Sequence, residues 1–197
     1  MKHLVEHART FPLRAAQLPE EWSRLSEGQS PHALFITCSD SRVVPSLITG
    51  ARPGELFELR TAGNVVPHHG WPHPSGEAAT IEYAVEVLGI TEVIVCGHSH
   101  CGAVGALLRQ EDLRAVPAVR AWLRQATPLP EGADRAAPDI AEAVQAHVLD
   151  QLARLQAYPC VARRLAAGSI RLYGWFYEIH TGSVLAHRPG SDAFFAL

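Results

Sequence analysis

The segment HALFITCSDSR (residues 32–42) decides the fold class. It begins as a continuous apolar run and then changes abruptly to polar and charged residues. A run that is apolar on both faces is typical of a strand buried inside a parallel sheet. The segment EVIVCGH (92–98) has the same character and also ends in metal-type residues. The two segments predict neighbouring parallel strands whose carboxyl ends carry the chemistry of the protein.

Helices alternate with strands around these two segments. The sequence predicts helices over 19–28, 76–88, 102–110 and 139–158, a further strand over 55–60, and irregular structure over 111–138. Residues 169–188 predict two strands around a turn at Thr181 and Gly182. This order favours an α/β fold with a mostly parallel sheet, flanked by helices and completed by a C-terminal hairpin.

Length and charge limit the possible functions. The 197 residues, 47% hydrophobic and 19% charged with a net charge of -3, fit a single domain over 1–197 and exclude a disordered chain. The lack of a positive excess argues against a nucleic-acid partner. No apolar run approaches the ~18 residues of a membrane helix, and residues 1–14 lack the apolar core of a secretory signal. We therefore expect a cytoplasmic protein with no membrane partner.

Three residues at the ends of the two buried runs are potential metal ligands. Cys38 ends the first run, and His98 and Cys101 follow the second at a spacing of three residues. Two thiolates and one imidazole suit Zn²⁺, and three protein ligands leave a fourth position open, as in catalytic zinc sites. The other two cysteines, Cys96 and Cys160, are interpreted as structural residues.

Asp40 and Arg42 follow Cys38 at intervals of two residues. In an extended chain this spacing places the three side chains on one side, where Arg42 can hold Asp40 as a bidentate fork. A carboxylate held by arginine stays ionised and can accept the proton of a metal-bound water. Alternatively, Asp40 can ligate the metal itself and close the site, and the residues alone leave both roles open.

Four motifs resemble those of the β-class carbonic anhydrases: CSDSR (38–42), LRTAGN (59–64), IEYAV (81–85) and GHSHCG (97–102). The resemblance covers roughly residues 29–188 as a catalytic core and leaves 1–28 as an N-terminal helical arm. It implies one zinc ion per chain and a sheet extended across a homodimer or a higher even oligomer. It also implies the reversible hydration of CO2 to bicarbonate and a proton by a zinc-bound hydroxide.

The resemblance assigns roles to individual residues. Cys38, His98 and Cys101 match the zinc ligands, whereas Asp40 and Arg42 match the pair that accepts the proton and gates the fourth position. In the family, part of the substrate pocket comes from the partner subunit. The positions that match the substrate-binding residues are Gln29, Phe57, Ala62, Tyr83 and Gly102.

Two positions depart from the family pattern. Thr61 stands where asparagine is usual, which removes an amide donor near the pocket wall. Phe35 stands where bicarbonate-inhibited members carry tryptophan, although Arg60 and Tyr177 match other positions of that inhibitory site. The resemblance therefore implies the plant-like subtype with an open metal site. Two alternatives stay open: hydrolysis of a CO2 analogue such as carbonyl sulfide or carbon disulfide, and a catalytically silent zinc scaffold.

Overall fold

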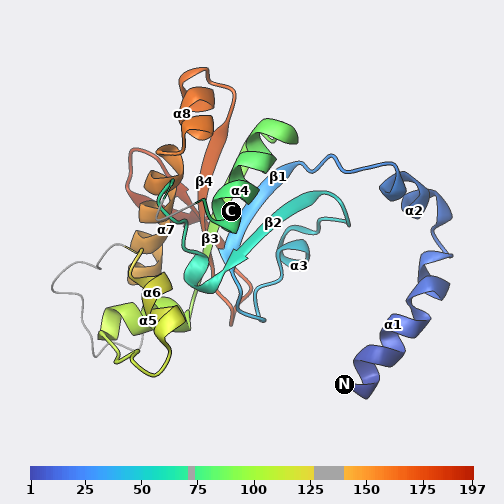
Figure 1. Cartoon of the computed structure of the whole chain (residues 1–197), viewed down its shortest axis with the longest axis horizontal. Helices are drawn as coiled ribbons and strands as arrows, with labels where there is room; N and C mark the ends of the chain where they lie inside the picture. Colours follow the sequence, from blue (N-terminus) through green and yellow to red (C-terminus); the bar gives the residue numbers. More distant parts are fainter. Residues whose placement is uncertain (71–73, 127–139) are drawn as a thin grey trace.

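The computed structural model describes residues 1–70, 74–126 and 140–197, and within them the strands form one six-stranded sheet (Figure 1). The strand order is β2-β1-β3-β4-β5-β6. The first four strands in this order run parallel, whereas β5 is antiparallel to β4 and β6 is antiparallel to β5. The bounds are β1 (Ala33–Cys38), β2 (Leu56–Thr61), β3 (Glu92–His98), β4 (Arg171–Tyr177), β5 (Val184–Arg188) and β6 (Ala193–Ala196).

This topology confirms the predicted α/β fold. The two segments that decide the fold, β1 and β3, are parallel neighbours, so their carboxyl ends meet at one edge of the sheet. The predicted hairpin is formed by β4 and β5. The edge strand β6 was not predicted, because its four residues are too few to show a strand pattern.

Eight α-helices and two short helical turns are described besides the strands. Their bounds are α1 (Lys2–Ala15), α2 (Pro19–Ser26), α3 (Pro45–Thr49), α4 (Gly76–Glu82), α5 (Gly102–Arg109), α6 (Pro117–Leu123), α7 (Ala141–Gln156) and α8 (Pro159–Ala166), with a 3-10 turn η1 (Ala62–Asn64) and a π-helical turn η2 (Tyr83–Val87). The prediction of irregular structure over 111–138 is wrong at α6, where Pro117 begins the helix at a position that needs no backbone N–H. The rest of that prediction over 127–138, and the first residue of the helix predicted at 139–158, lie outside the described residues.

The helix predicted over 76–88 begins and ends as expected but changes form midway. The Ala78 backbone N–H donates to Ser75 Oγ at 3.2 Å, which is the predicted N-cap. Beyond α4, the Leu88 N–H donates to Tyr83 O at 3.0 Å, a bond across five residues that widens the last turn. Tyr83 therefore stands at the junction of the α-helix and the π-helical turn.

Helix α7 packs closely against the sheet because a glycine faces it in β3. A Cβ atom added to Gly97 in β3 would lie 2.6 Å from Val144 Cγ1 and 2.7 Å from Val148 Cγ2 of α7, so a larger residue there would push the helix away. On the opposite face of the sheet, Cys96 is buried beside Phe35, and burial raises the pKa of its thiol to about 12. Cys96 is therefore a core residue, as predicted.

The two N-terminal helices extend away from the sheet (Figure 1), and no residue of α1 or α2 is buried. A cavity of about 520 Å³ is lined by α2 and by the turn before β2, and Gln29 is one of its lining residues. Among the described residues, no helix is both long and apolar enough to cross a lipid bilayer.

Candidate metal centre

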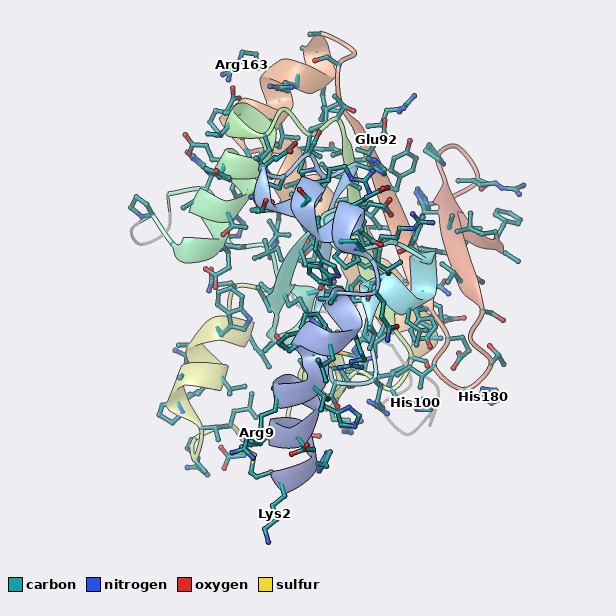
Figure 2. All side chains as sticks on the ribbon, turned by 90° about the vertical axis from the view of Figure 1, so that its right-hand side faces the viewer. Lys2, Arg9, Glu92, His100, Arg163 and His180 are labelled. Carbon is teal, nitrogen blue, oxygen red and sulfur yellow. The ribbon has the colours of Figure 1, made fainter. Side chains whose placement is uncertain are left out.

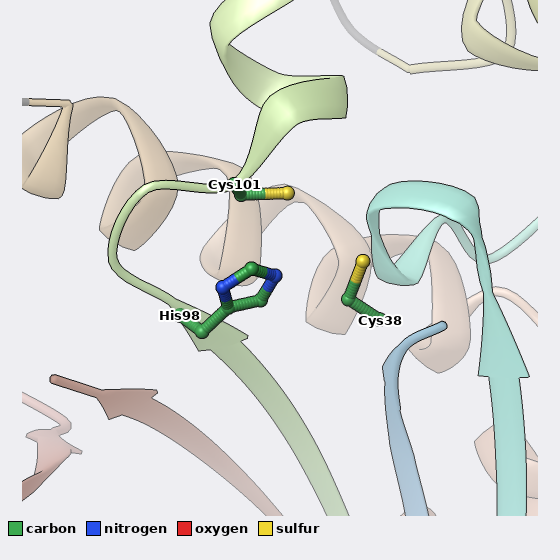
Figure 3. Close-up of side chains that lie close together, drawn as sticks. All are labelled: Cys38, His98 and Cys101. Atoms are coloured by element: carbon green, nitrogen blue, oxygen red, sulfur yellow. The ribbon is translucent and has the colours of Figure 1, made fainter. Parts of the chain in front are cut away.

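Cys38, His98 and Cys101 converge at the carboxyl edge of the sheet (Figure 3). Cys38 is the last residue of β1, His98 is the last residue of β3, and Cys101 directly precedes α5. Their ligand atoms all lie within 4.8 Å of one another, and all three residues are buried. The convergence expected from two adjacent parallel strands is confirmed.

The orientation of the His98 ring suits metal ligation. Its Nδ1 lies 2.8 Å from the backbone oxygen of Ser99, and because a carbonyl only accepts, Nδ1 carries the proton. The other nitrogen, Nε2, is buried and has no hydrogen-bond partner among the described residues. A histidine that donates from one nitrogen and presents the lone pair of the other is the arrangement of metal-binding imidazoles. The donor set and this free lone pair fit a zinc ion.

The two cysteine side chains affect each other's pKa in opposite directions. The Cys101 side chain lowers the pKa of Cys38 to about 4 against the opposing effect of burial. Smaller contributions to this low pKa come from the His98 side chain and the backbone N–H groups of Asp40 and Gly63. The Cys38 side chain and burial raise the pKa of Cys101 above its usual range. A divalent cation bound between them would stabilise both sulfur atoms as thiolates.

Asp40 and Arg42 form the predicted bidentate pair beside these ligands. Arg42 Nε donates to Asp40 Oδ1 at 2.9 Å and Nη2 donates to Oδ2 at 2.7 Å. These bonds hold the pKa of the Asp40 carboxyl well below its usual range. Asp40 Oδ2 lies 3.9 Å from His98 Nε2, so the carboxylate borders the metal centre.

The expected extended geometry of this pair is wrong. β1 ends at Cys38, and the chain turns at Ser41 and Arg42 instead of continuing the strand. Two bonds from backbone N–H groups form the turn: the Arg42 N–H donates to the side-chain Oδ1 of Asp40 at 2.9 Å, and the Val43 N–H donates to the backbone O of Asp40 at 3.1 Å. The two side chains meet because the turn folds them together, not because strand residues alternate.

Arg60 holds this turn from the neighbouring strand. Its guanidinium donates to the backbone oxygens of Cys38, Asp40 and Val43 at 3.2, 2.9 and 2.7 Å. The sequence offered no signal for this role, because backbone oxygens leave no mark in the sequence. Phe35 points to the opposite face of the sheet, where its ring packs edge-on against Trp175 at 5.9 Å.

Two of the five predicted substrate-binding residues lie at the metal centre. Ala62 follows β2, and the N–H of the next residue, Gly63, donates to Cys38 Sγ at 3.4 Å. Gly102 is the first residue of α5, directly after Cys101. A Cβ added to Gly102 would meet no atom within 4 Å, so space remains open beside the ligands.

The other three predicted substrate-binding residues lie at the amino end of the sheet. Phe57 pairs with Leu34 and stands four residues before Thr61, which places it roughly 13 Å along the strand from the level of Cys38. Tyr83 stacks on Phe57 with ring centroids 6.0 Å apart and is 44% exposed. Gln29 precedes β1 and lines the cavity below α2. One chain does not bring these three residues to its own metal centre.

Comparisons with known proteins agree with this site and fold. The carbonic anhydrase family matches residues 33–184. The carbonic anhydrase of Pseudomonas aeruginosa is 47% identical over 178 residues, covering 88% of this chain and 80% of that protein. That of Synechococcus elongatus is 42% identical over 203 residues, covering 98% and 74%.

Solved structures show the same relationship. The β-carbonic anhydrase CcaA is similar with a TM-score of 0.92 and 40% identity, covering 100% of this chain and 99% of that chain. Tetrameric β-carbonic anhydrases from Sordaria macrospora give a TM-score of 0.76 at 26% identity, covering 94% of each chain. The chain therefore belongs to the β-carbonic anhydrase family, and the predicted enzyme class is confirmed.

Proposed function

We propose that this chain binds one zinc ion through Cys38, His98 and Cys101 and catalyses the reversible hydration of CO2 to bicarbonate and a proton. The observation that carries the proposal is the buried His98 Nε2, which has no partner among the described residues and lies within 4.8 Å of both sulfur atoms. Zinc bound there would lower the pKa of a water molecule at its open position to about 7 and thereby supply a nucleophile at neutral pH.

Asp40 accepts the proton that the reaction releases beside the metal centre. Its pKa is held low by Arg42, so the carboxylate is ionised and available as an acceptor at neutral pH. Arg42 binds both carboxylate oxygens, and this favours an open site over one in which Asp40 ligates the metal. Arg60 favours the same subtype. Its guanidinium already donates to three backbone oxygens, and an inhibitory bicarbonate would need these donors.

The substrate pocket is shared between two copies of the chain. Ala62 and Gly102 line the metal side, and Gln29, Phe57 and Tyr83 of a second copy supply the opposite wall. The separation of these two groups along the sheet and the exposed ring of Tyr83 support this arrangement. So do the tetrameric relatives from Sordaria macrospora. CO2 is apolar, and the stacked rings of Phe57 and Tyr83 offer it an apolar surface.

The same assembly gives a role to the N-terminal arm. Residues 1–28 form the arm, and 29–188 form the catalytic core whose sheet extends across the dimer. In α1, Leu4, Phe11 and Leu13 are exposed, although apolar side chains gain free energy when they are covered. A second copy of the core is the surface that the arm would cover. The cytoplasmic location stays a prediction.

Stopped-flow measurement of CO2 hydration tests the proposed activity. The full chain, loaded with one zinc ion, should accelerate the pH change well above the buffer rate, and removal of zinc by a chelator should abolish the acceleration. A fully zinc-loaded chain with no rate above buffer would contradict the proposal and favour a silent scaffold. Carbonyl sulfide tested in parallel should give the lower kcat/KM, and a higher value would reassign the substrate.

A further inference from the structure

We infer that His147 is a positioning residue for the metal ligand Cys38 and acts through Gly63. The inference rests on the proposed metal site, because it concerns the sulfur atom that would bind the ion. His147 belongs to α7, and it does not contact the ligands directly. Its influence passes through two hydrogen bonds, one on each side of the Gly63 Cα atom.

The first bond joins α7 to the segment after β2. His147 is 2% exposed, and its Nε2 lies 2.8 Å from Gly63 O. Because a carbonyl oxygen only accepts, Nε2 must carry the proton, and Nδ1 presents a lone pair toward the Gln151 amide at 3.5 Å. Burial lowers the pKa of His147, which keeps the ring neutral and in this tautomer at neutral pH.

The second bond joins Gly63 to the ligand. The Gly63 N–H donates to Cys38 Sγ at 3.4 Å. Gly63 has a φ of 71°, a conformation that favours glycine. A Cβ added there would lie 2.9 Å from Ala103 Cβ of α5, so no larger side chain fits at this position. His147 holds the carbonyl group of Gly63 in place. The N–H of the same residue is thereby directed at Cys38 Sγ.

Further buried contacts tie the segment that follows to the same part of the molecule. Gln151, one turn after His147, accepts the Val66 N–H at 2.8 Å with Oε1. The Tyr158 hydroxyl, beyond the end of α7, donates to Pro67 O at 2.8 Å. Of these bonds, only the one from His147 reaches a residue that also donates a hydrogen bond to Cys38, namely Gly63. His147 therefore differs from its neighbours in what it positions.

A hydrogen bond to a thiolate withdraws electron density from the sulfur and orients its lone pairs. Loss of the His147 donor would leave Gly63 O buried without its partner, and the Gly63 N–H would no longer be held toward Cys38. Residues that orient metal ligands typically contribute 10–100-fold to metal affinity. For a residue acting through one backbone link, we expect zinc affinity to weaken about tenfold, at the lower end of this range.

Cobalt substitution of the full chain tests the inference without relying on CO2 hydration. His147→Leu removes the donor and is expected to shift the thiolate-to-cobalt charge-transfer band to lower energy and to weaken zinc affinity about tenfold in chelator competition. His147→Gln offers an amide N–H near the position of Nε2 and should restore both values toward wild type. An unchanged band and affinity in His147→Leu, or a His147→Gln that behaves like His147→Leu, would overturn the inference.

Tyr158→Phe is the matched control. It removes a buried hydrogen bond to the same segment, at Pro67, and should lower the melting temperature while leaving the cobalt band in place. A band shift as large as that of His147→Leu would show a general loosening of the segment and contradict the specific role of His147.

A second measurement decides the matter if His147→Leu does not fold. In wild-type protein loaded with cadmium-113, the Gly63 amide proton should show scalar coupling to the metal through Cys38 Sγ, and the His147 nitrogens should report the Nε2–H tautomer. Absence of either signal in cadmium-bound protein would overturn the inference. Failure of the wild-type chain to bind metal would instead refute the proposed site and the inference with it.

Discussion

The two ends of the sheet differ in the burial and in the chemistry of their side chains. Figure 2 shows Glu92, the first residue of β3, in the upper half of the view, and His100, two residues after the end of β3, in the lower half. The carboxyl end contains buried ligand-type side chains and a carboxylate held by arginine. The amino end contains the exposed Tyr83, its partner Phe57 and a cavity that includes Gln29.

Under the proposed function, this difference separates what one chain does alone from what needs a second copy. Parallel strands bring their carboxyl ends together, so the candidate metal ligands meet within one chain. The proposed substrate wall lies at the other end of the same strands and reaches a metal centre only from a neighbouring copy. Mutations at the two ends should therefore have different consequences in isolated and mixed assemblies.

The largest effect is expected at the carboxyl end. Cys101→Ala should lose the single zinc ion and reduce CO2 hydration at least about a thousandfold, because the metal supplies several kcal/mol of stabilisation. Cys160→Ala is the matched control, since Cys160 is also buried but packs in the main core cluster. Atomic absorption should give no zinc in the first variant and one per chain in the second. Retention of zinc by Cys101→Ala would break the ligand assignment.

Asp40→Asn tests the proton acceptor separately from the metal. The variant should keep its zinc and lose about a hundredfold in kcat, the scale typical of a missing general base. Asp112→Asn is the control, because Asp112 forms the same two bonds with an arginine two residues later but lies at the surface. Stopped-flow kinetics should show near wild-type turnover for the control. Unchanged turnover in Asp40→Asn would remove Asp40 from the mechanism.

Mixed assemblies test whether the two ends belong to different copies. The double variant Gln29→Ala/Tyr83→Ala should lower kcat/KM about tenfold, because the loss of the Tyr83 ring alone removes roughly 1–2 kcal/mol of apolar contact. Refolded together with Cys101→Ala, it should yield mixed dimers with one site that combines an intact metal centre and an intact wall. Activity per zinc should rise above that of the double variant alone. No recovery in dimers confirmed to be mixed would place both halves of the pocket in one chain.

The smallest effect concerns the pH dependence of stability. Burial lowers the pKa of His147, so the unfolded chain binds this proton more tightly than the folded chain. The contribution of His147 to the free energy of unfolding is therefore complete above about pH 6.5 and declines as the pH falls below that value. His147→Gln should make the decline shallower by up to about 1.4 kcal/mol per pH unit, as measured by denaturant unfolding at pH 8 and 5.5. Equal slopes in the two proteins would show that His147 takes up no proton on unfolding.

Much of the carboxyl end could be predicted from the sequence. Two continuous apolar runs identify β1 and β3, and the rule that parallel strands align their ends brings Cys38, His98 and Cys101 together. The pairing of Asp40 with Arg42 was also predicted, but through strand alternation instead of the turn that forms it. Functional side chains can be recognised in the sequence when they directly follow apolar runs that form strands.

The contacts made by backbone atoms could not be predicted. Arg60 acts on three carbonyl oxygens and His147 acts on one, and any residue type supplies a carbonyl. The position of Phe57 could be derived from strand register only after the pairing with β1 was known. The short strand β6 and the helix α6 escaped prediction because few residues define them and packing against their neighbours stabilises them.

A crystal structure with anomalous scattering data at the zinc edge tests the central claim most directly. The account predicts one strong zinc peak per chain, bonded to Cys38 Sγ, His98 Nε2 and Cys101 Sγ at about 2.3 Å for sulfur and 2.0–2.1 Å for nitrogen, with the fourth position taken by solvent. No peak among these three side chains in protein that contains one zinc per chain would contradict it.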